Sequence, residues 1–225
     1  MKRPKVRGAT GNEFPSGNHR PSQNSRRLRA TSLRTHRANS RRPMISVFGS
    51  SRAVPDDGLF EEGLAMGRLL GANGFDVTTG GYTGVMEAVS RGAAEAGAHV
   101  VGVTMSRFED RPNPYLMNEV RVPNFYVRFR WLIDHVDGFI AMRGGMGTLA
   151  EMTFAWQKLS LRMFAERPLV LVGLGWRPVL DAWAENLTVT LDDYRDLTVV
   201  DSPKHAIDVL RAFFSRTEAA RRASL

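Results

Sequence analysis

From residue 44 onward, short apolar runs rich in β-branched residues alternate with longer segments whose apolar residues recur every three or four positions. The short runs are typical of buried strands, and the longer segments are typical of amphipathic helices. We predict strands at residues 45–49, 75–79, 99–104, 138–142, 169–172 and 198–200. We predict helices at about residues 58–72, 85–97, 125–136, 148–162, 177–191 and 204–216.

This alternation predicts one α/β domain over residues 44–225, a single Rossmann-like, doubly wound parallel sheet with helices on both faces. Ligands of such folds bind in the crevice beyond the carboxyl ends of the strands. The connection at residues 106–124 carries three prolines and leaves a strand at that edge. It is predicted to be a lid or an oligomer contact, with an ordinary surface loop as the equal alternative.

Residues 1–43 differ in composition from the rest of the chain. They hold 12 of its 31 Lys and Arg residues but one of its 23 acidic residues, Glu13, and few large apolar residues. Such a segment buries too little surface to offset chain entropy, so we predict a disordered basic extension. We interpret it as a solvated extension, or as the result of a wrongly assigned start codon, with translation beginning at Met44. The alternatives are nonspecific binding of nucleic acid, for which this extension is the one candidate segment, and an organellar transit peptide.

Absent features narrow the function classes. The chain has no cysteine, which excludes disulfides and thiolate metal sites, and its five histidines lack metal-binding spacing, so no metal or cofactor is expected. It has no apolar run of about 18 residues, so we expect no membrane partner. We expect a cytoplasmic location. A G-x-x-x-x-G-K-[ST] loop is also missing, which argues against ATP hydrolysis of the P-loop type.

Two glycine-rich turns stand where a predicted strand meets a predicted helix. They are G-G-Y-T-G at residues 80–84 and G-G-M-G-T at residues 144–148, with Glu151 three residues further on. Glycine lets backbone N–H groups approach a ligand closely, and the start of a helix adds its positive dipole end. The two turns therefore predict a cradle for a phosphorylated ligand about the size of a nucleotide.

The motifs G-G-x-x-G-x-M at residues 80–86 and G-G-x-G-T-x-x-E at residues 144–151 follow a strand ending in F-G-S-S at residues 48–51. Together they resemble the LOG family, whose characterised members are cytokinin riboside 5′-monophosphate phosphoribohydrolases. The resemblance covers about residues 44–215. It implies a homodimeric hydrolase that cleaves AMP or a cytokinin riboside 5′-monophosphate into free base and ribose 5-phosphate. The alternative is a non-catalytic module of the same fold that binds a nucleotide or another phosphorylated ligand, as a sensor or carrier.

Glu151 is the candidate catalytic carboxylate. Cleavage of an N-glycosidic bond develops positive charge on the sugar, which a carboxylate near the anomeric carbon stabilises. The alternative is structural, because Thr148-x-x-Glu151 also has the spacing of a helix capping box. The resemblance favours catalysis, since the family assigns a catalytic role to the matching glutamate.

Arg128 matches the first residue of an Arg-Lys pair in the family, and Phe129 stands where the lysine is usual. A guanidinium there is predicted to contact the leaving base or to orient Glu151. The alternative is a solvated helix face. Arg143 stands where the family usually has proline, and it either contacts the ligand or pairs with a surface acid.

The remaining predicted contacts come from the strand end and the two turns. Ser50 and Ser51 are candidates for phosphate or ribose binding, with helix capping as the alternative. Met86 is a candidate base contact, with a core position as the alternative. Trp131 and Trp156 are compatible with a dimer face but more typical of a core. The full set of predicted substrate-binding residues is Gly49, Ser50, Ser51, Gly80, Gly81, Gly84, Met86, Arg143, Gly144, Gly145, Gly147 and Thr148.

Overall fold

The computed structural model describes residues 42–107 and 111–223. The disordered extension predicted over residues 1–43 lies outside the described residues, apart from Arg42 and Pro43. These two residues already contact the domain, because Arg42 donates a hydrogen bond to the carbonyl of Gly97 and the carbonyl of Pro43 accepts one from the backbone N–H of Asp76. The described part therefore begins two residues before the predicted boundary.

Seven parallel strands form one sheet in the order β4-β3-β2-β1-β5-β6-β7, which confirms the predicted Rossmann-like α/β fold. The strands are β1 (Met44–Phe48), β2 (Asp76–Thr79), β3 (Val100–Met105), β4 (Asn118–Val122), β5 (Gly138–Ala141), β6 (Leu169–Val172) and β7 (Leu197–Val200). The helices are α2 (Gly58–Ala72), α3 (Val85–Glu95), α4 (Phe125–Asp134), α5 (Met146–Ser160), α6 (Trp176–Asn186), α7 (Leu191–Tyr194) and α8 (Pro203–Ala223).

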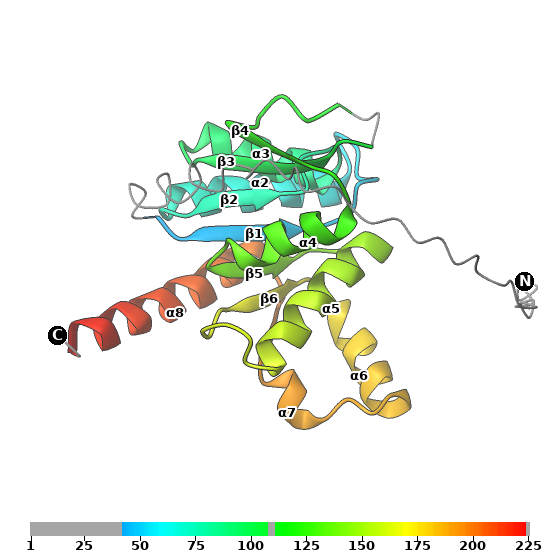
Figure 1. Cartoon of the computed structure of the whole chain (residues 1–225), viewed down its shortest axis with the longest axis vertical. Coiled ribbons are helices and arrows are strands. Elements are labelled where there is room, and N and C mark those ends of the chain that lie inside the picture. The colour runs from blue at the N-terminus through cyan, green and yellow to red at the C-terminus, as the bar shows by residue number, and fades with distance from the viewer. Residues whose placement is uncertain (1–41, 108–110, 224–225) are drawn as a thin grey trace, which may run out of the picture. The chain divides into compact units, whose positions relative to one another are not determined.

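Helices cover both faces of the sheet. Successive side chains of a strand point to opposite faces, so each central strand contributes apolar residues to both helix layers. Val47 of β1 belongs to the apolar cluster that α2, α3 and α8 cover, whereas Phe48 belongs to the cluster under α4, α5 and α6. Figure 1 shows the two helix layers, with α4 and α5 on one side of the strands and α2 and α3 on the other. The central strands are buried on both faces and accordingly consist of near-continuous apolar runs.

The structure corrects the prediction for residues 106–124, which contain a seventh strand, β4. Three of its five residues, Asn118, Glu119 and Arg121, are exposed, and only Val122 is buried. An edge strand that carries charges on its open side is protected against pairing with other chains, but it lacks the apolar pattern of a buried strand. That is why the sequence pattern did not indicate it.

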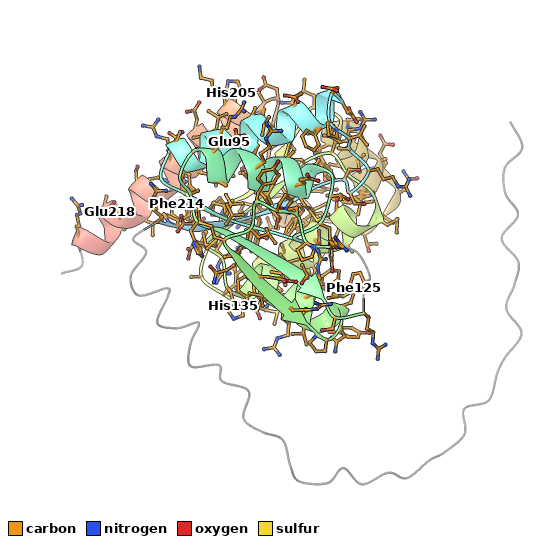
Figure 2. All side chains as sticks on the ribbon, turned by 90° about the horizontal axis from the view of Figure 1, so that it is seen from above. Glu95, Phe125, His135, His205, Phe214 and Glu218 are labelled. Carbon is orange, nitrogen blue, oxygen red and sulfur yellow. The ribbon has the colours of Figure 1, made fainter. Side chains whose placement is uncertain are left out.

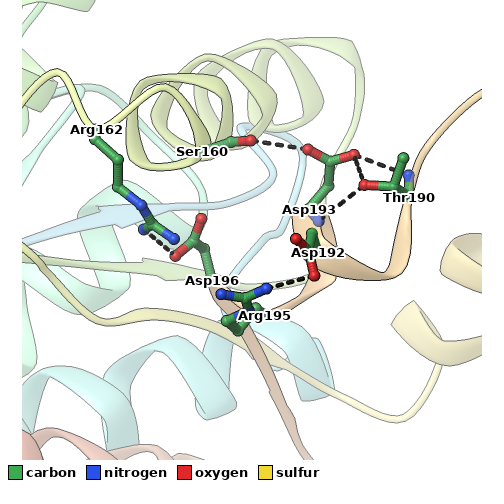
Figure 3. A network of polar contacts seen from close by, with 7 residues as sticks. All are labelled: Ser160, Arg162, Thr190, Asp192, Asp193, Arg195 and Asp196. Carbon is green, nitrogen blue, oxygen red and sulfur yellow. Dashed lines mark hydrogen bonds and ion pairs between the residues drawn. The ribbon is translucent and has the colours of Figure 1, made fainter.

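Helix α7 and its flanks were also missed, and polar contacts hold them against the end of α5 (Figure 3). Asp193 accepts hydrogen bonds from Thr190 and from Ser160 of α5, and Arg162 pairs with Asp196 at 2.8 Å. The indole of Trp156 donates to the carbonyl of Asp193. Trp156 is 8% exposed and stacks on the ring of Trp183, so it is a core residue.

Helix α8 continues to Ala223, beyond its predicted end at residue 216. Phe214 packs against Phe75, with 5.6 Å between the ring centroids, while Glu218 lies on the part of the helix that extends past the sheet (Figure 2). None of the helices in residues 42–107 and 111–223 combines the length and apolarity that crossing a membrane requires.

Candidate functional site

The site lies at the switch point of the sheet, between the neighbouring strands β1 and β5. The chain leaves β1 toward α2 on one face and leaves β5 toward α5 on the other, which opens a crevice at the carboxyl ends of these strands. A cavity of about 980 Å³ occupies this position. Eleven of the predicted site residues line it, and they are Gly49, Ser50, Ser51, Met86, Arg128, Arg143, Gly144, Gly145, Gly147, Thr148 and Glu151.

Ser50 joins the three loops that form the cavity. Its backbone N–H donates to the carbonyl of Arg143 at 3.2 Å, and its carbonyl accepts from the N–H of Val85 at 2.8 Å. Its hydroxyl oxygen accepts from the N–H of Arg52. The alternative of a helix cap is wrong for Ser50 and Ser51, because Asp57 caps α2. Ser50 therefore holds the ends of β1 and β5 and the start of α3 in one arrangement.

The turn at residues 80–84 lines the cavity through Tyr82 and Thr83, whereas its glycines Gly80, Gly81 and Gly84, which were predicted to contact the substrate, lie outside the lining. A Cβ on Gly80 would lie 1.9 Å from the Nη2 atom of Arg128, and one on Gly84 would lie 2.3 Å from the carbonyl oxygen of Ser50. Gly84 also has a positive φ of 77°, which side chains disfavour. These glycines let Arg128 and the β1 loop approach the turn.

Helix α5 starts at Met146, two residues earlier than predicted, so the capping-box interpretation of Thr148 and Glu151 is wrong. Gly145 occupies the N-cap position, and no side chain of the described residues caps this end. The first backbone N–H groups of a helix have no acceptor within it, so those of Met146, Gly147 and Thr148 are available at the cavity lining. The start of α5 is thus suited to binding an anion.

Arg128 and Glu151 form a buried ion pair at the cavity, with 2.9 Å between Nη1 and Oε1. The two other guanidinium nitrogens are also occupied, since Nε donates to the carbonyl of Val103 at 2.8 Å and Nη2 donates to that of Gly80 at 3.2 Å. Arg128 is 6% exposed, so the alternative of a solvated helix face is wrong. Arg128 therefore contacts the Glu151 carboxylate directly, and its predicted role in orienting Glu151 stays a prediction.

Burial raises the pKa of the Glu151 carboxyl above its usual range, and the adjacent charge and hydrogen bond of Arg128 oppose that rise. A carboxyl group in such a setting can exchange a proton nearer to neutral pH than a solvated one. The site therefore combines a helix start that is suited to an anion with a carboxyl group whose pKa is raised.

Phe129 lies outside the cavity lining and packs between Phe125 and Phe154, at ring-centroid distances of 5.4 and 6.0 Å. The position that carries lysine in the LOG family therefore belongs to an aromatic cluster of α4 and α5 here. Arg143 does line the cavity, and its side chain forms no ion pair with another described residue. Its pairing with a surface acid is not observed.

Sequence reasoning missed several lining residues, notably Arg52, Asp57 and Tyr82. Arg52 directly follows Ser51 and Tyr82 belongs to the first glycine turn, so their places beside predicted residues were a usable signal. The hydroxyl of Tyr82 accepts a hydrogen bond from the N–H of Met105 at 2.7 Å, and its ring lies 5.9 Å from the Arg128 guanidinium carbon. Tyr82 thus links the turn to β3 and to Arg128.

Known proteins resemble this chain in sequence and in fold. Residues 42–207 match the model of the SLOG cluster4 family. The chain is 28% identical over 171 residues to a probable cytokinin riboside 5′-monophosphate phosphoribohydrolase, LOG4, of Oryza sativa subsp. japonica, covering 74% of this chain and 70% of the relative. It is 28% identical over 135 residues to the cytokinin riboside 5′-monophosphate phosphoribohydrolase LOG3 of Arabidopsis thaliana, covering 58% and 61%. The solved structure of a molybdenum cofactor binding protein from Rippkaea orientalis superposes with a TM-score of 0.60 at 23% identity, covering 77% of this chain and 98% of that one, which shows a shared fold.

Proposed function

Because the chain belongs to the SLOG cluster4 family, a LOG-like family, we propose that it hydrolyses the N-glycosidic bond of adenine-type nucleoside 5′-monophosphates. The products are the free base and ribose 5-phosphate. The observation that carries this proposal is the buried pair of Arg128 and Glu151 in a cavity that also holds the start of α5. The start of α5 suits a phosphate, and the buried carboxylate suits a sugar that becomes positively charged.

The 5′-phosphate is proposed to bind at the start of α5. Backbone N–H groups of Gly147 and Thr148, together with the helix dipole, favour an anion there. A Cβ on Gly145 or Gly147 would meet no atom within 4 Å, so the space beside these residues is open to a ligand.

Glu151 is proposed to act on the anomeric carbon. When the bond from the sugar to the base breaks, the electron pair leaves with the base, and the carboxylate stabilises the positive charge on the sugar. A water molecule then bonds to the anomeric carbon and loses one proton to Glu151, which passes that proton to the departing base and is a carboxylate again. Arg128 acts as a positioning residue, since all of its guanidinium nitrogens contact protein groups.

A homodimer stays a prediction that rests on the resemblance. The start of α4 offers Phe125 and Tyr126, which are 46% and 83% exposed, as an apolar surface for such an interface. Figure 2 shows Phe125 at the periphery of the molecule.

The test is incubation with a panel of nucleoside 5′-monophosphates, with free base measured by chromatography. We expect base release from AMP or an N6-substituted analogue, and much slower release from the corresponding nucleosides, which lack the anion. Saturable binding of the monophosphates without base release would support the binding-module alternative. Equal turnover of adenosine and AMP would contradict the assignment of α5 to the phosphate.

A further inference from the structure

Two arginines of the cavity lining have side chains without polar contacts to other described residues. The side chains of Arg52 and Arg143 form no hydrogen bond or ion pair with another described residue, whereas Arg128 has three hydrogen-bonded partners. Both side chains are exposed at the cavity. An arginine guanidinium is suited to bidentate contacts with phosphate.

Ser50 fixes the backbone of both arginines at one place. Its N–H donates to the carbonyl of Arg143 and its hydroxyl oxygen accepts from the N–H of Arg52. The two side chains therefore leave from adjacent backbone positions, although Arg52 belongs to the loop after β1 and Arg143 to the loop after β5. Two arginine side chains that leave from one place can contact the same anion, which offsets their like charges.

The carboxylates of the lining do not neutralise these arginines through direct contacts. The lining contains two acidic residues, Asp57 and Glu151. Asp57 accepts a hydrogen bond from the N–H of Leu59 at the start of α2, and Glu151 is paired with Arg128. Beside its one arginine–carboxylate pair, the cavity thus presents two arginines that no carboxylate of the lining contacts.

A single phosphate does not require these two side chains. It has three terminal oxygens, and the start of α5 supplies the backbone N–H groups of Met146, Gly147 and Thr148 as donors for them. The volume of about 980 Å³ is near the upper end of the range of about 300 to 1,000 Å³ that small-molecule sites occupy. Donors and space therefore remain for a second anionic group.

We propose that Arg52 and Arg143 form a second anion subsite, which binds the second phosphate of a nucleoside 5′-diphosphate. This inference rests on the proposed nucleotide site and extends its ligand class from monophosphates to ligands with a pyrophosphate group. It concerns binding only, so it does not depend on whether the bond to the base is cleaved.

The test uses inorganic phosphate and inorganic pyrophosphate as probes, because neither contains a glycosidic bond. Calorimetric titration at fixed ionic strength is made with the full chain and with Arg52→Gln, Arg143→Gln and the control Arg177→Gln. Arg177 is exposed on α6 and lies outside the cavity lining, and its replacement causes the same change in net charge. Glu151→Gln, which is expected to bind without turnover, then allows AMP and ADP to be compared in the same way.

We expect pyrophosphate to bind at least about tenfold more tightly than phosphate, and ADP more tightly than AMP. Arg52→Gln and Arg143→Gln should each lower the affinity for pyrophosphate at least about tenfold and the affinity for phosphate less than about threefold. The control Arg177→Gln should change neither affinity by more than about twofold. An equal loss for both probes would show that the arginines hold a single phosphate and would overturn the proposal. No preference for pyrophosphate in the unmodified chain would also overturn it. A lack of base release in the panel assay would count against the hydrolase alone.

Discussion

Arg128 of α4 and Glu151 of α5 meet across 2.9 Å although both side chains are buried, at 7% and 11% side-chain exposure. The same guanidinium also binds the carbonyls of Val103 in β3 and of Gly80 at the end of β2. One side chain therefore ties two strands and two helices together at the cavity. A carboxylate held in this way keeps its position when a ligand enters, which is the preorganisation that charge stabilisation requires.

Replacement of Glu151 by Gln tests its proposed catalytic role. We expect nucleotide binding to stay within about threefold of that of the unmodified chain, and base release to fall at least about a hundredfold, the usual scale for a positioned acid–base group. Thermal melting must be measured alongside, because the amide leaves the charge of Arg128 without its counter-ion. Glu166→Gln, an exposed residue outside the cavity lining, is the matched control. An unchanged rate in Glu151→Gln would refute the assignment.

The pH dependence of base release should report the Glu151 carboxyl. Burial raises its pKa above the usual value of 4.5, and Arg128 opposes the rise. Because the carboxylate is the form that acts, kcat/KM should fall as the pH drops through this raised pKa. Arg128→Gln removes the opposing charge, so the acidic limb should move to still higher pH, and Arg128→Lys should return it toward the original position. The substrate phosphate also titrates near pH 6, but equally for all three proteins, so the displacement between profiles is the measurement. Coincident acidic limbs would show that this limb does not belong to Glu151.

The sheet was predictable because its central strands are short, buried runs of apolar residues. Strand β6 occupies residues 169–172 as predicted. Strand β4 was missed because it lies at the sheet edge and exposes Asn118, Glu119 and Arg121. Propensity and periodicity describe packing against neighbours, and an edge strand has few of them.

The candidate site was predicted only where local pattern marks it. Glycines before a helix indicated the anion cradle, and a resemblance indicated Glu151 and Arg128. The contact between these two side chains joins residues 23 positions apart, and no local spacing specifies it. Arg52 could have been predicted from its place after Ser51, but only the three-dimensional structure brings its loop next to Arg143 through Ser50.

Gly147→Ala should separate ligand binding from folding. A Cβ on Gly147 meets no atom within 4 Å, and alanine is preferred to glycine in helices by roughly 0.5–1 kcal/mol, so the melting temperature should be unchanged or higher. The added methyl group enters open space beside the start of α5, where the phosphate is proposed to bind. We expect KM for AMP to rise at least about tenfold. Gly175→Ala, at the start of α6 and with equally open surroundings, serves as the control. Equal KM values for the two variants would place the phosphate elsewhere.

Asn113 is expected to position the first glycine turn from the connection between β3 and β4. It is 6% exposed, its backbone N–H donates to the carbonyl of Gly81 at 2.9 Å, and its Nδ2 donates to that of Tyr82 at 3.1 Å. Asn113→Ala leaves the carbonyl of Tyr82 without this donor, so the free energy of unfolding should fall by about 1–3 kcal/mol. Because Tyr82 lines the cavity, KM should rise as well. Asn118→Ala on the exposed edge strand is the control for both measurements. If Asn113→Ala is less stable but has the same KM as Asn118→Ala, then Asn113 supports the fold and not the site.

The basic extension should be separable from the domain, but the cut must fall before Arg42. A chain beginning at Arg42 retains the hydrogen bonds of Arg42 to Gly97 and of Asp76 to Pro43, so its melting temperature and its rate of base release should equal those of the full chain. A chain beginning at Met44 lacks both bonds and should be less stable by about 1–2 kcal/mol, since a hydrogen bond contributes about 1 kcal/mol. Affinity for DNA or RNA should be confined to the full chain and should weaken steeply with salt, because residues 1–43 hold 12 Lys and Arg residues. Calorimetry, base release and titration with a DNA duplex on the three chains provide the measurements. A lower rate for the chain that begins at Arg42 would show that the extension contributes to the site.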